Sequence, residues 1–155
     1  MKFRDRAVLF LATGFFVGTV PFAPGTFGSL IGLPVCFLIS GLNIFLSVTG
    51  TLLFIFFAIW VAAAAAKILK KEDPAEIVID EIAGLIVTFV GIPFTLKTAM
   101  AGFILFRTFD ILKPFPIRTI EKKVAGGSGV VLDDVMAGIY GNLILRLAIY
   151  STGII

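Results

Sequence analysis

The 155-residue chain is 59% hydrophobic and only 15% charged, and its mean hydropathy is +1.09. Soluble domains are about 45–50% apolar and about 25% charged, so too few polar residues remain to cover a water-soluble surface. The net charge of +3 comes from short basic clusters between apolar runs, which excludes a nucleic-acid-binding surface. The composition predicts an all-α integral membrane protein with a single polytopic domain, residues 1–155.

The first apolar run, residues 7–20, follows a basic start and is too short to cross a bilayer. A signal peptide begins similarly, but bulky residues and Pro21 follow, without a small-residue cleavage pattern. We therefore expect an interfacial or re-entrant helix here. About five later runs are long enough to be transmembrane helices, which take about 17–25 residues each: 27–46, 50–68, 75–92, 94–112 and 133–153.

The stretch PFAPGTFGSL, residues 21–30, separates the short run from the first predicted span. Backbone that is not helical survives at membrane depth only where it lines a polar cavity or is buried in protein. Gly25 and Gly28 let backbone N–H groups approach an anion, and Thr26 and Ser29 add hydroxyl donors. We predict that this stretch binds a phosphate group; the alternative is a plain turn with Thr26 or Ser29 as N-cap.

The sequence around Asp73 has the features of a helix start. Asp73 is a favourable N-cap residue, Pro74 suits the first helical position and Glu76 the third. The pattern predicts a helix that begins at Pro74. Asp80 and Glu81 would then lie about two turns inside it, where neither a cap nor the first turn explains them.

Proline and glycine indicate the other helix boundaries. We expect a helix to start at Asp133, after a flexible GGSG segment at 126–129. Pro93 is expected to open the fourth span, and Pro114 and Pro116 to end it. The basic residues that follow should lie in a loop.

Basic residues indicate the orientation, because they accumulate on the cytoplasmic side of membrane helices. Ten of the thirteen fall into three clusters: Lys2, Arg4 and Arg6; Lys67, Lys70 and Lys71; Lys113, Arg118, Lys122 and Lys123. The clusters share one side only if residues 7–20 do not cross and the other five segments do. This topology puts the N-terminus in the cytoplasm and Lys97 outside, and it leaves Arg146 within a span without an obvious partner.

Five carboxylates fall at the helix ends that this topology places at the cytoplasmic face: Asp80, Glu81, Asp110, Asp133 and Asp134. Acids in membrane helices cost about 2.5–3.5 kcal/mol each on insertion scales and are usually functional. Converging acids repel one another unless a cation lies between them. Because the chain has no histidine and a single cysteine, Cys36, the ligands would be oxygen atoms, which suit Mg²⁺.

Some of these acids have a structural alternative. Asp133 can be an N-cap, and Asp134 can be a favourable charge in the first turn of the same helix. Asp110 can form an i, i+3 ion pair with Arg107. Taken together, the five acids predict a Mg²⁺ site.

A carboxylate-held metal beside basic side chains suits phosphoryl chemistry. Mg²⁺ polarises a phosphoryl oxygen and orients water, while Arg107 and Lys113 offset the charge on the phosphate. Lys113 can instead be an ordinary positive-inside charge. A site at the headgroup level of the cytoplasmic leaflet makes a phospholipid the natural substrate; no protein partner can be inferred. The spacing alone does not separate a hydrolase from a transferase or an ion transporter.

Four blocks of sequence occur in order through most of the chain: GTVPFAPGTFGSL (18–30), DPAEIVIDEIAG (73–84), FRTFDILKPFPI (106–117) and VVLDDVMAG (130–138). Together they resemble the phosphatidylglycerophosphatase A family. The resemblance implies a Mg²⁺-dependent phosphatase of the bacterial inner membrane that converts phosphatidylglycerophosphate to phosphatidylglycerol and inorganic phosphate. It also implies that the five acids, all within these blocks, belong to the site.

The chain lacks the sequence signatures of phosphatases that form a covalent phosphoenzyme. Cys36 has no catalytic arginine after it, histidine is absent, and no D-x-D start of an aspartyl-phosphate enzyme is present. We predict direct attack by a metal-activated water, with Glu81 or Asp134 accepting its proton. One alternative is a CDP-alcohol-type phospholipid phosphotransferase, but its D-G-x₂-A-R start is missing. The other is a cation transporter, whose acids would lie nearer mid-membrane.

Overall fold

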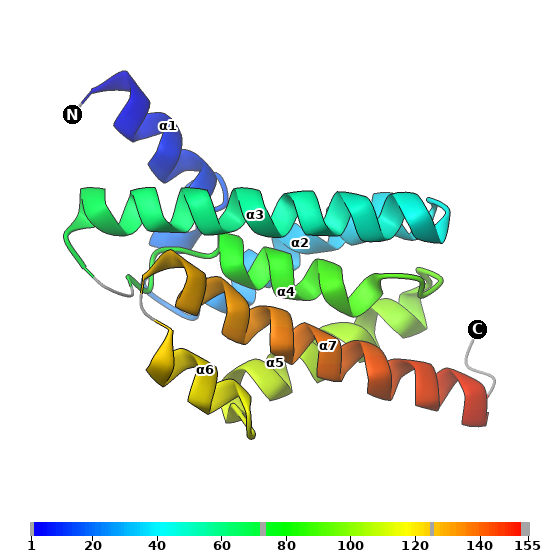
Figure 1. The fold of residues 1–155 in the computed structure, drawn as a ribbon. Coiled ribbons are helices and arrows are strands. Elements are labelled where there is room, and N and C mark those ends of the chain that lie inside the picture. The colour runs from blue at the N-terminus through cyan, green and yellow to red at the C-terminus, as the bar shows by residue number, and fades with distance from the viewer. Residues whose placement is uncertain (1, 72–73, 125, 153–155) are drawn as a thin grey trace.

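The computed structural model describes residues 2–71, 74–124 and 126–152 (Figure 1). The helices are α1 (Phe3–Ala12), α2 (Pro24–Ser40), α3 (Ile44–Leu69), α4 (Ile79–Phe89), α5 (Leu96–Leu112), α6 (Ile117–Lys123) and α7 (Gly127–Thr152), with a 3₁₀ turn at Val17–Thr19. These ranges contain no strand, which confirms the predicted all-α class for the part of the chain described.

Helix α4 is the buried centre of the bundle and packs against α2, α3, α5 and α7 (Figure 1). Nine of its eleven residues are buried. Two glycines let α4 and α7 approach closely: a Cβ atom at Gly138 would overlap the carbonyl oxygen of Gly84, and one at Gly84 would lie 2.5 Å from the carbonyl oxygen of Asp134. The central packing therefore depends on the absence of side chains at these two positions.

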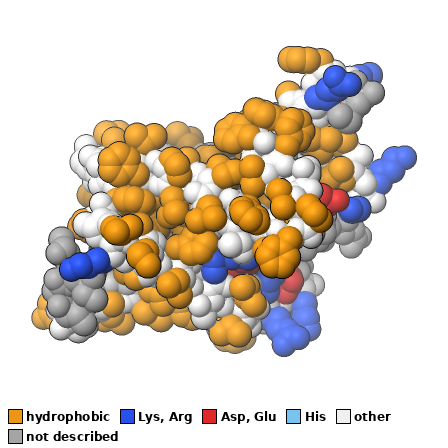
Figure 2. Space-filling view, turned by 180° about the vertical axis from the view of Figure 1, so that it is seen from behind, with side chains coloured by type: hydrophobic (Ala, Val, Ile, Leu, Met, Phe, Trp, Pro, Cys, Tyr) orange, Lys and Arg blue, Asp and Glu red, His pale blue; other side chains and the backbone are white. Residues whose placement is uncertain are grey.

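The outer surface of the bundle is largely apolar. Phe45, Phe56 and Tyr150 are 75%, 70% and 92% exposed, and hydrophobic side chains cover most of the body in Figure 2. Among the described helices, α3 alone is long and apolar enough to cross a membrane by length and composition. Helix α2 is apolar but has 17 residues, and α4 has 11.

The helix predicted to begin at Pro74 begins instead at Ile79, and its predicted N-cap, Asp73, lies outside the described residues. Residues 74–78 form a turn that is tied to α1, because the N–H of Val78 donates to the carbonyl of Ala12 at 2.9 Å. A cap pattern describes only local sequence and does not register this contact.

This shorter helix changes the position of the first acidic pair. Asp80 and Glu81 lie in the first turn of α4, not two turns inside a longer helix. A first-turn location is favourable for a carboxylate, since the N-terminal dipole carries partial positive charge. The prediction that the first turn cannot explain this pair is therefore wrong.

Helix α7 starts six residues earlier than the predicted start at Asp133. Gly127 and Gly129 are helical, and a Cβ atom on Gly127 would lie 2.5 Å from the backbone nitrogen of Ala63 in α3. Close packing thus orders the segment that we predicted to be flexible. Asp133 and Asp134 lie in the second turn of α7, so neither the N-cap nor the first-turn alternative applies.

Helix α5 begins after Thr95, whose side chain accepts a hydrogen bond from the N–H of Thr98 at 3.2 Å. The prediction that Pro93 opens this helix is wrong, because the Pro93 carbonyl instead accepts from the Thr98 hydroxyl at 2.7 Å. The helix ends two residues before Pro114, as predicted. The basic segment after it is not a simple loop, since it contains α6.

The N-terminal run predicted as one helix over 7–20 is divided. Helix α1 ends at Ala12, where the Thr13 hydroxyl donates to the Leu9 carbonyl at 2.7 Å and accepts from the Phe16 N–H at 3.0 Å. These bonds close the last turn and redirect the chain into the 3₁₀ turn. The N-terminal segment is thus a short helix followed by a 3₁₀ turn.

Candidate active site

A cavity of about 880 Å³ opens at the end of the bundle where α3 ends and α7 begins. It is lined by the start of α2, the end of α3, the start of α4, the end of α5 and the first turns of α7. All five predicted acids line this cavity: Asp80, Glu81, Asp110, Asp133 and Asp134. Segments far apart in the sequence therefore bring their charged side chains to one place.

Three of the acids form a tight cluster. One carboxylate oxygen each from Asp80, Glu81 and Asp134 lies within 4.8 Å of the other two. Asp80 and Asp134 are buried, and Glu81 is partly buried. The buried oxygens Asp80 Oδ1 and Glu81 Oε2 have no hydrogen-bond partner among the described residues. Unpartnered buried carboxylate oxygens are costly, and this oxygen-only donor set fits a hard divalent cation.

The other two acids are held by basic side chains. Asp110 is hydrogen-bonded to Arg107, so the i, i+3 pair predicted as an alternative for Asp110 is present. Asp133 Oδ2 lies 2.7 Å from Lys113 Nζ, which also lies 2.8 Å from Glu121 Oε1. The structure thus divides the five acids into a cluster of three and two ion pairs.

Lys113 is held as a cation at the rim of this site. Burial by itself would lower its pKa, but hydrogen bonds to Asp133 and Glu121 raise the pKa overall. Arg107 lies between the two groups of acids, with Nη1 3.9 Å from Glu81 Oε1 as well as bonded to Asp110. Two positive charges therefore stand beside the three clustered carboxylates, an arrangement suited to an anion that also contacts a metal.

A repeated pattern explains why Asp80 and Asp134 meet. Residues 80–84 read DEIAG and residues 134–138 read DVMAG, so each helix has an aspartate four residues before a glycine. Residues four apart share one helix face. The glycine of each pair permits the close approach of α4 and α7, and the aspartate one turn earlier is carried into the interface. The shared D-x-x-A-G pattern is a sequence signal that predicts which acids meet.

Helix α2 contributes Gly25 and Thr26 to the cavity. A Cβ atom on Gly25 would overlap Glu81 Oε1 and would lie 3.1 Å from Arg107 Nη1. The N-cap of α2 is Ala23, in the left-handed conformation with φ 47°, so the alternative of a Thr26 or Ser29 N-cap is wrong. A glycine here lets the start of α2 lie directly against the charged groups.

The other two predicted phosphate ligands of this stretch do not line the cavity. Gly28 packs on Val78, since a Cβ atom there would lie 2.5 Å from Val78 Cβ. Ser29 is fully buried, and its hydroxyl donates to the Gly25 carbonyl at 2.7 Å. Both residues thus have packing positions on the side of α2 that faces α4.

Arg146, which has no obvious partner in the sequence, caps the far end of α4 together with Asn142. The Asn142 amide donates to the carbonyls of Val87, Thr88 and Val90 at 3.3, 2.9 and 3.0 Å. Arg146 Nη2 donates to the Val90 carbonyl at 2.7 Å, and Nε donates to Asn142 Oδ1 at 2.8 Å. The pair thus donates to carbonyls at the C-terminal end of α4, of which that of Val87 also accepts from the N–H of Val90.

Asn142→Ala is expected to lower the free energy of unfolding by about 1–3 kcal/mol, because the Thr88 carbonyl loses its amide donor and Arg146 Nε loses its acceptor. Leu143→Ala, at the exposed neighbouring position, is the control. Denaturant titration of the purified variants measures the difference. Equal stability of the Asn142 variant and the wild type would show that this cap does not stabilise α4.

A family profile and two relatives of known name point to the same protein family. The chain matches the sequence profile of phosphatidylglycerophosphatase A over residues 10–149. It is 36% identical over 136 residues to phosphatidylglycerophosphatase A of Escherichia coli, covering 87% of this chain and 79% of the relative. The Haemophilus influenzae protein of that name is 38% identical over 143 residues, covering 87% and 84%.

A relative from Bacteroides thetaiotaomicron has a different name. It is called a putative phosphatidylinositol-3-phosphatase and is 35% identical over 161 residues, covering 99% of this chain and 100% of the relative. No solved structure is significantly similar to the chain. All three relatives are named for the removal of phosphate from a phospholipid headgroup.

Proposed function

The chain belongs to the phosphatidylglycerophosphatase A family, and from that premise we propose that it hydrolyses phosphatidylglycerophosphate to phosphatidylglycerol and inorganic phosphate. The observation that carries the proposal is a cavity in which three clustered carboxylates lie beside Arg107 and Lys113. Carboxylates alone would repel a phosphate, and basic groups alone would bind it without activating water. Their combination suits phosphoryl transfer.

Mg²⁺ is the proposed cofactor, held by Asp80, Glu81 and Asp134. The support is the donor set itself, with oxygens from two helices within 4.8 Å of one another and two of these carboxylates each leaving a buried oxygen unpartnered. When bound, Mg²⁺ would polarise a phosphoryl oxygen and favour deprotonation of the attacking water. Asp110 and Asp133, also predicted as metal ligands, are assigned the role of positioning Arg107 and Lys113.

The protein groups around the substrate take separate roles. Arg107, Lys113 and the start of α2 at Gly25 and Thr26 bind the phosphomonoester, since they line the cavity with two positive charges and the N-terminal end of a helix. Glu81 accepts the proton of the attacking water, because it is the member of the acidic cluster that lies beside Arg107, with Oε1 3.9 Å from Nη1. A new bond joins the water oxygen to phosphorus, the phosphorus–glycerol oxygen bond breaks, and that oxygen takes up a proton.

We place this site at the cytoplasmic face of the bacterial inner membrane, in a single polytopic domain over residues 1–155. Three features support the placement: the membrane-compatible α3, the large exposed apolar side chains, and the gathering of most Lys and Arg at one end of the molecule (Figure 2). The cavity opens at the end where α3 stops, with Lys67 in its last turn and Lys70 and Lys71 directly after it. Cytoplasmic ends of membrane helices are enriched in such residues.

Phosphatidylinositol 3-phosphate is a second candidate substrate, favoured by the full-length match to the Bacteroides relative. Both lipids carry one phosphomonoester and one phosphodiester, so hydrolysis of the monoester is the same reaction in each. The polyol that joins the two phosphates differs. Purified protein supplied with each lipid in mixed micelles should release inorganic phosphate, and phosphatidylglycerophosphate should be converted to phosphatidylglycerol. Failure to release phosphate from either lipid would reject the proposed phosphatase and leave the transferase and transporter alternatives.

Gly25→Ala is expected to reduce kcat/KM for phosphatidylglycerophosphate about a hundredfold, because displacement of reacting groups by about 1 Å can have that effect. The added methyl group would overlap Glu81 Oε1. Gly50→Ala is the matched control, since nothing lies within 4 Å of its added Cβ atom. Steady-state kinetics measure both variants, and unchanged activity of the Gly25 variant would remove the start of α2 from the site.

A further inference from the structure

A second cavity, here called the α3–α7 groove, lies in the half of the bundle away from the acids. Helices α3 and α7 touch at Ala63 and Gly127 and diverge from there (Figure 1). The groove between them measures about 300 Å³ and has the end of α4 as its floor. Its lining is mostly aliphatic and includes Val48, Leu52 and Ile55 of α3, Val87 of α4, and Ile139 and Leu143 of α7. The described lining residues of the two cavities do not overlap.

Arg146 is the one charged side chain among the described residues that line the groove. The side chain is exposed, and its Nη2 and Nε donate to the Val90 carbonyl and to Asn142 Oδ1. Its Nη1 makes no hydrogen bond to any residue in the described ranges. The cap on α4 therefore leaves part of the guanidinium open to a ligand, and its planar set of donors matches a phosphate.

No acidic side chain among the described residues lies at the Arg146 end of the molecule. Glu76 pairs with Lys71 at the acidic cavity, and Asp5 is in α1, which begins toward that same end (Figure 1). The two acids at 72 and 73 lie outside the described residues and directly follow the lysines that line that cavity. Residues 153–155 have no acidic side chain. The remaining acids all line the acidic cavity: Asp80, Glu81, Asp110, Glu121, Asp133 and Asp134.

The groove is about as long as the hydrocarbon layer of one membrane leaflet. Val135 and Arg146 are the first and last residues of α7 that line it. At 1.5 Å per residue they are about 16 Å apart along the helix, and half of a bilayer's hydrocarbon core is about 15 Å. A Cβ atom on Gly91 would lie 2.7 Å from Arg146 Nη2 and 3.0 Å from Ile44 Cδ1, so the guanidinium is level with the first residue of α3. In the membrane placement proposed above, this is the headgroup level of the leaflet opposite the acids.

We propose that the α3–α7 groove binds an anionic phospholipid, with an acyl chain between the two helices and the phosphate on Arg146. Lipid tails are as apolar as the groove, so the tail fills it without selecting one lipid over another. Selection comes from Arg146, because a zwitterionic headgroup brings its own cation to the phosphate and an anionic one does not. The inference goes beyond the proposed function. It uses the membrane placement but not the phosphatase reaction, so either can fail alone.

Photolabelling tests the place and the preference together. The purified protein is placed in phosphatidylcholine nanodiscs with a small fraction of phosphatidylserine or phosphatidylcholine that has a photoactivatable acyl chain. Neither probe has a phosphomonoester, so neither is a substrate of the proposed reaction. Peptide mass spectrometry should locate the label on the groove residues of α3 and α7. The phosphatidylserine probe should label them about tenfold more strongly, as expected for a charged hydrogen bond.

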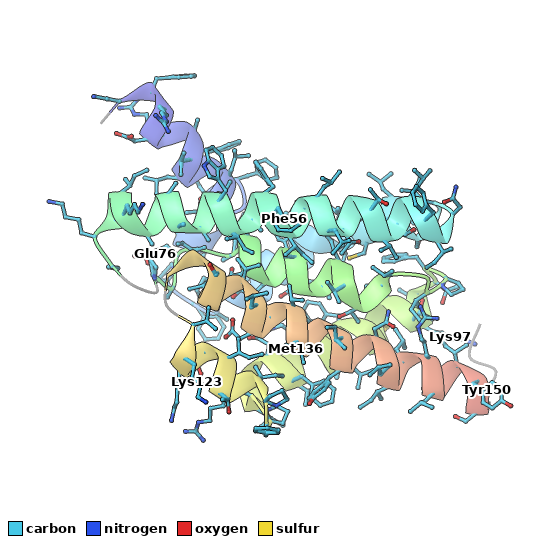
Figure 3. The ribbon with its side chains drawn as sticks, in the orientation of Figure 1. Phe56, Glu76, Lys97, Lys123, Met136 and Tyr150 are labelled. Atoms are coloured by element: carbon cyan, nitrogen blue, oxygen red, sulfur yellow. The ribbon has the colours of Figure 1, made fainter. Side chains whose placement is uncertain are left out.

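Arg146→Gln should reduce this preference to within twofold, and Arg146→Lys should retain most of it, because the charge remains. Asn142→Ala disturbs the same cap on α4 without removing the charge, so it should keep the preference and separate lipid binding from helix capping. Lys97→Met is the matched charge control. Lys97 lies at the same end of the bundle as Tyr150 (Figure 3) but does not line the groove, so its loss should change nothing.

Three results would overturn the inference. Equal labelling of the groove by both probes would show that Arg146 is only a helix cap, and so would an undiminished preference in Arg146→Gln. Absence of label from the groove would reject a bound lipid, and cross-linked dimers in the same nanodiscs would identify a second copy of the chain as the occupant. Release of phosphate from phosphatidylglycerophosphate by the wild type is unaffected by any of these results, so the proposed function would stand.

Discussion

Asp134→Asn is expected to lower the rate of phosphate release from phosphatidylglycerophosphate by roughly three orders of magnitude, because a bound metal supplies several kcal/mol of transition-state stabilisation. Asparagine keeps the shape of the side chain but removes the negative charge that faces Asp80 and Glu81. Asp80→Asn should have the same effect for the same reason. Initial rates measured with purified variants at saturating lipid give the comparison.

Two controls separate loss of the site from loss of the fold. Asp5→Asn makes the same change in the first turn of α1, outside the cavity, and should leave the rate unchanged. In metal-free buffer, Asp134→Asn should unfold at the wild-type temperature or above, since it relieves repulsion within the cluster. Rates within tenfold of wild type for both Asp80→Asn and Asp134→Asn would contradict the assignment of these acids.

Gly138→Ala should reduce both stability and activity. Its added Cβ atom would overlap the Gly84 carbonyl oxygen, and relief of that overlap requires α4 and α7 to move apart. Overpacking of this kind costs about 1–3 kcal/mol. The same movement separates Asp80 from Asp134, so activity should fall about a hundredfold.

Gly50→Ala again serves as the control, because it adds the same atom to a helix where nothing lies within 4 Å. Alanine in a helix interior is favoured over glycine by up to about 1 kcal/mol, so this variant should be at least as stable as wild type. Denaturant titration and phosphate release are measured on the same preparations. Wild-type activity in Gly138→Ala would show that the acids do not depend on the close contact of α4 and α7.

The sequence predicts the helical class and the identity of the five acids, since both depend on residue type and local spacing. It does not predict where α4 begins, because the hydrogen bond from Val78 to Ala12 joins segments more than sixty residues apart. It likewise misses the division of the acids into a cluster and two ion pairs. That division follows from packing of α4 on α7, although the shared D-x-x-A-G spacing contains the information.

The PFAPGTFGSL stretch shows how far residue types alone can mislead. Its prolines and glycines suggest an irregular loop whose polar residues all face a ligand, yet Pro24 opens α2 and most of the stretch is helical. A helix presents different residues to different neighbours. Gly25 and Thr26, in the first turn of α2, line the cavity, whereas Gly28 and Ser29, one turn further along, pack inside the bundle.

The central claim is that Asp80, Glu81 and Asp134 hold a divalent cation needed for hydrolysis of phosphatidylglycerophosphate. The most direct measurement is phosphate release by purified protein after EDTA treatment and during titration with Mg²⁺. The account predicts that wild-type activity disappears with EDTA and returns with Mg²⁺, whereas Asp134→Asn regains little at any Mg²⁺ concentration that restores the wild type. Full wild-type activity in EDTA would contradict it.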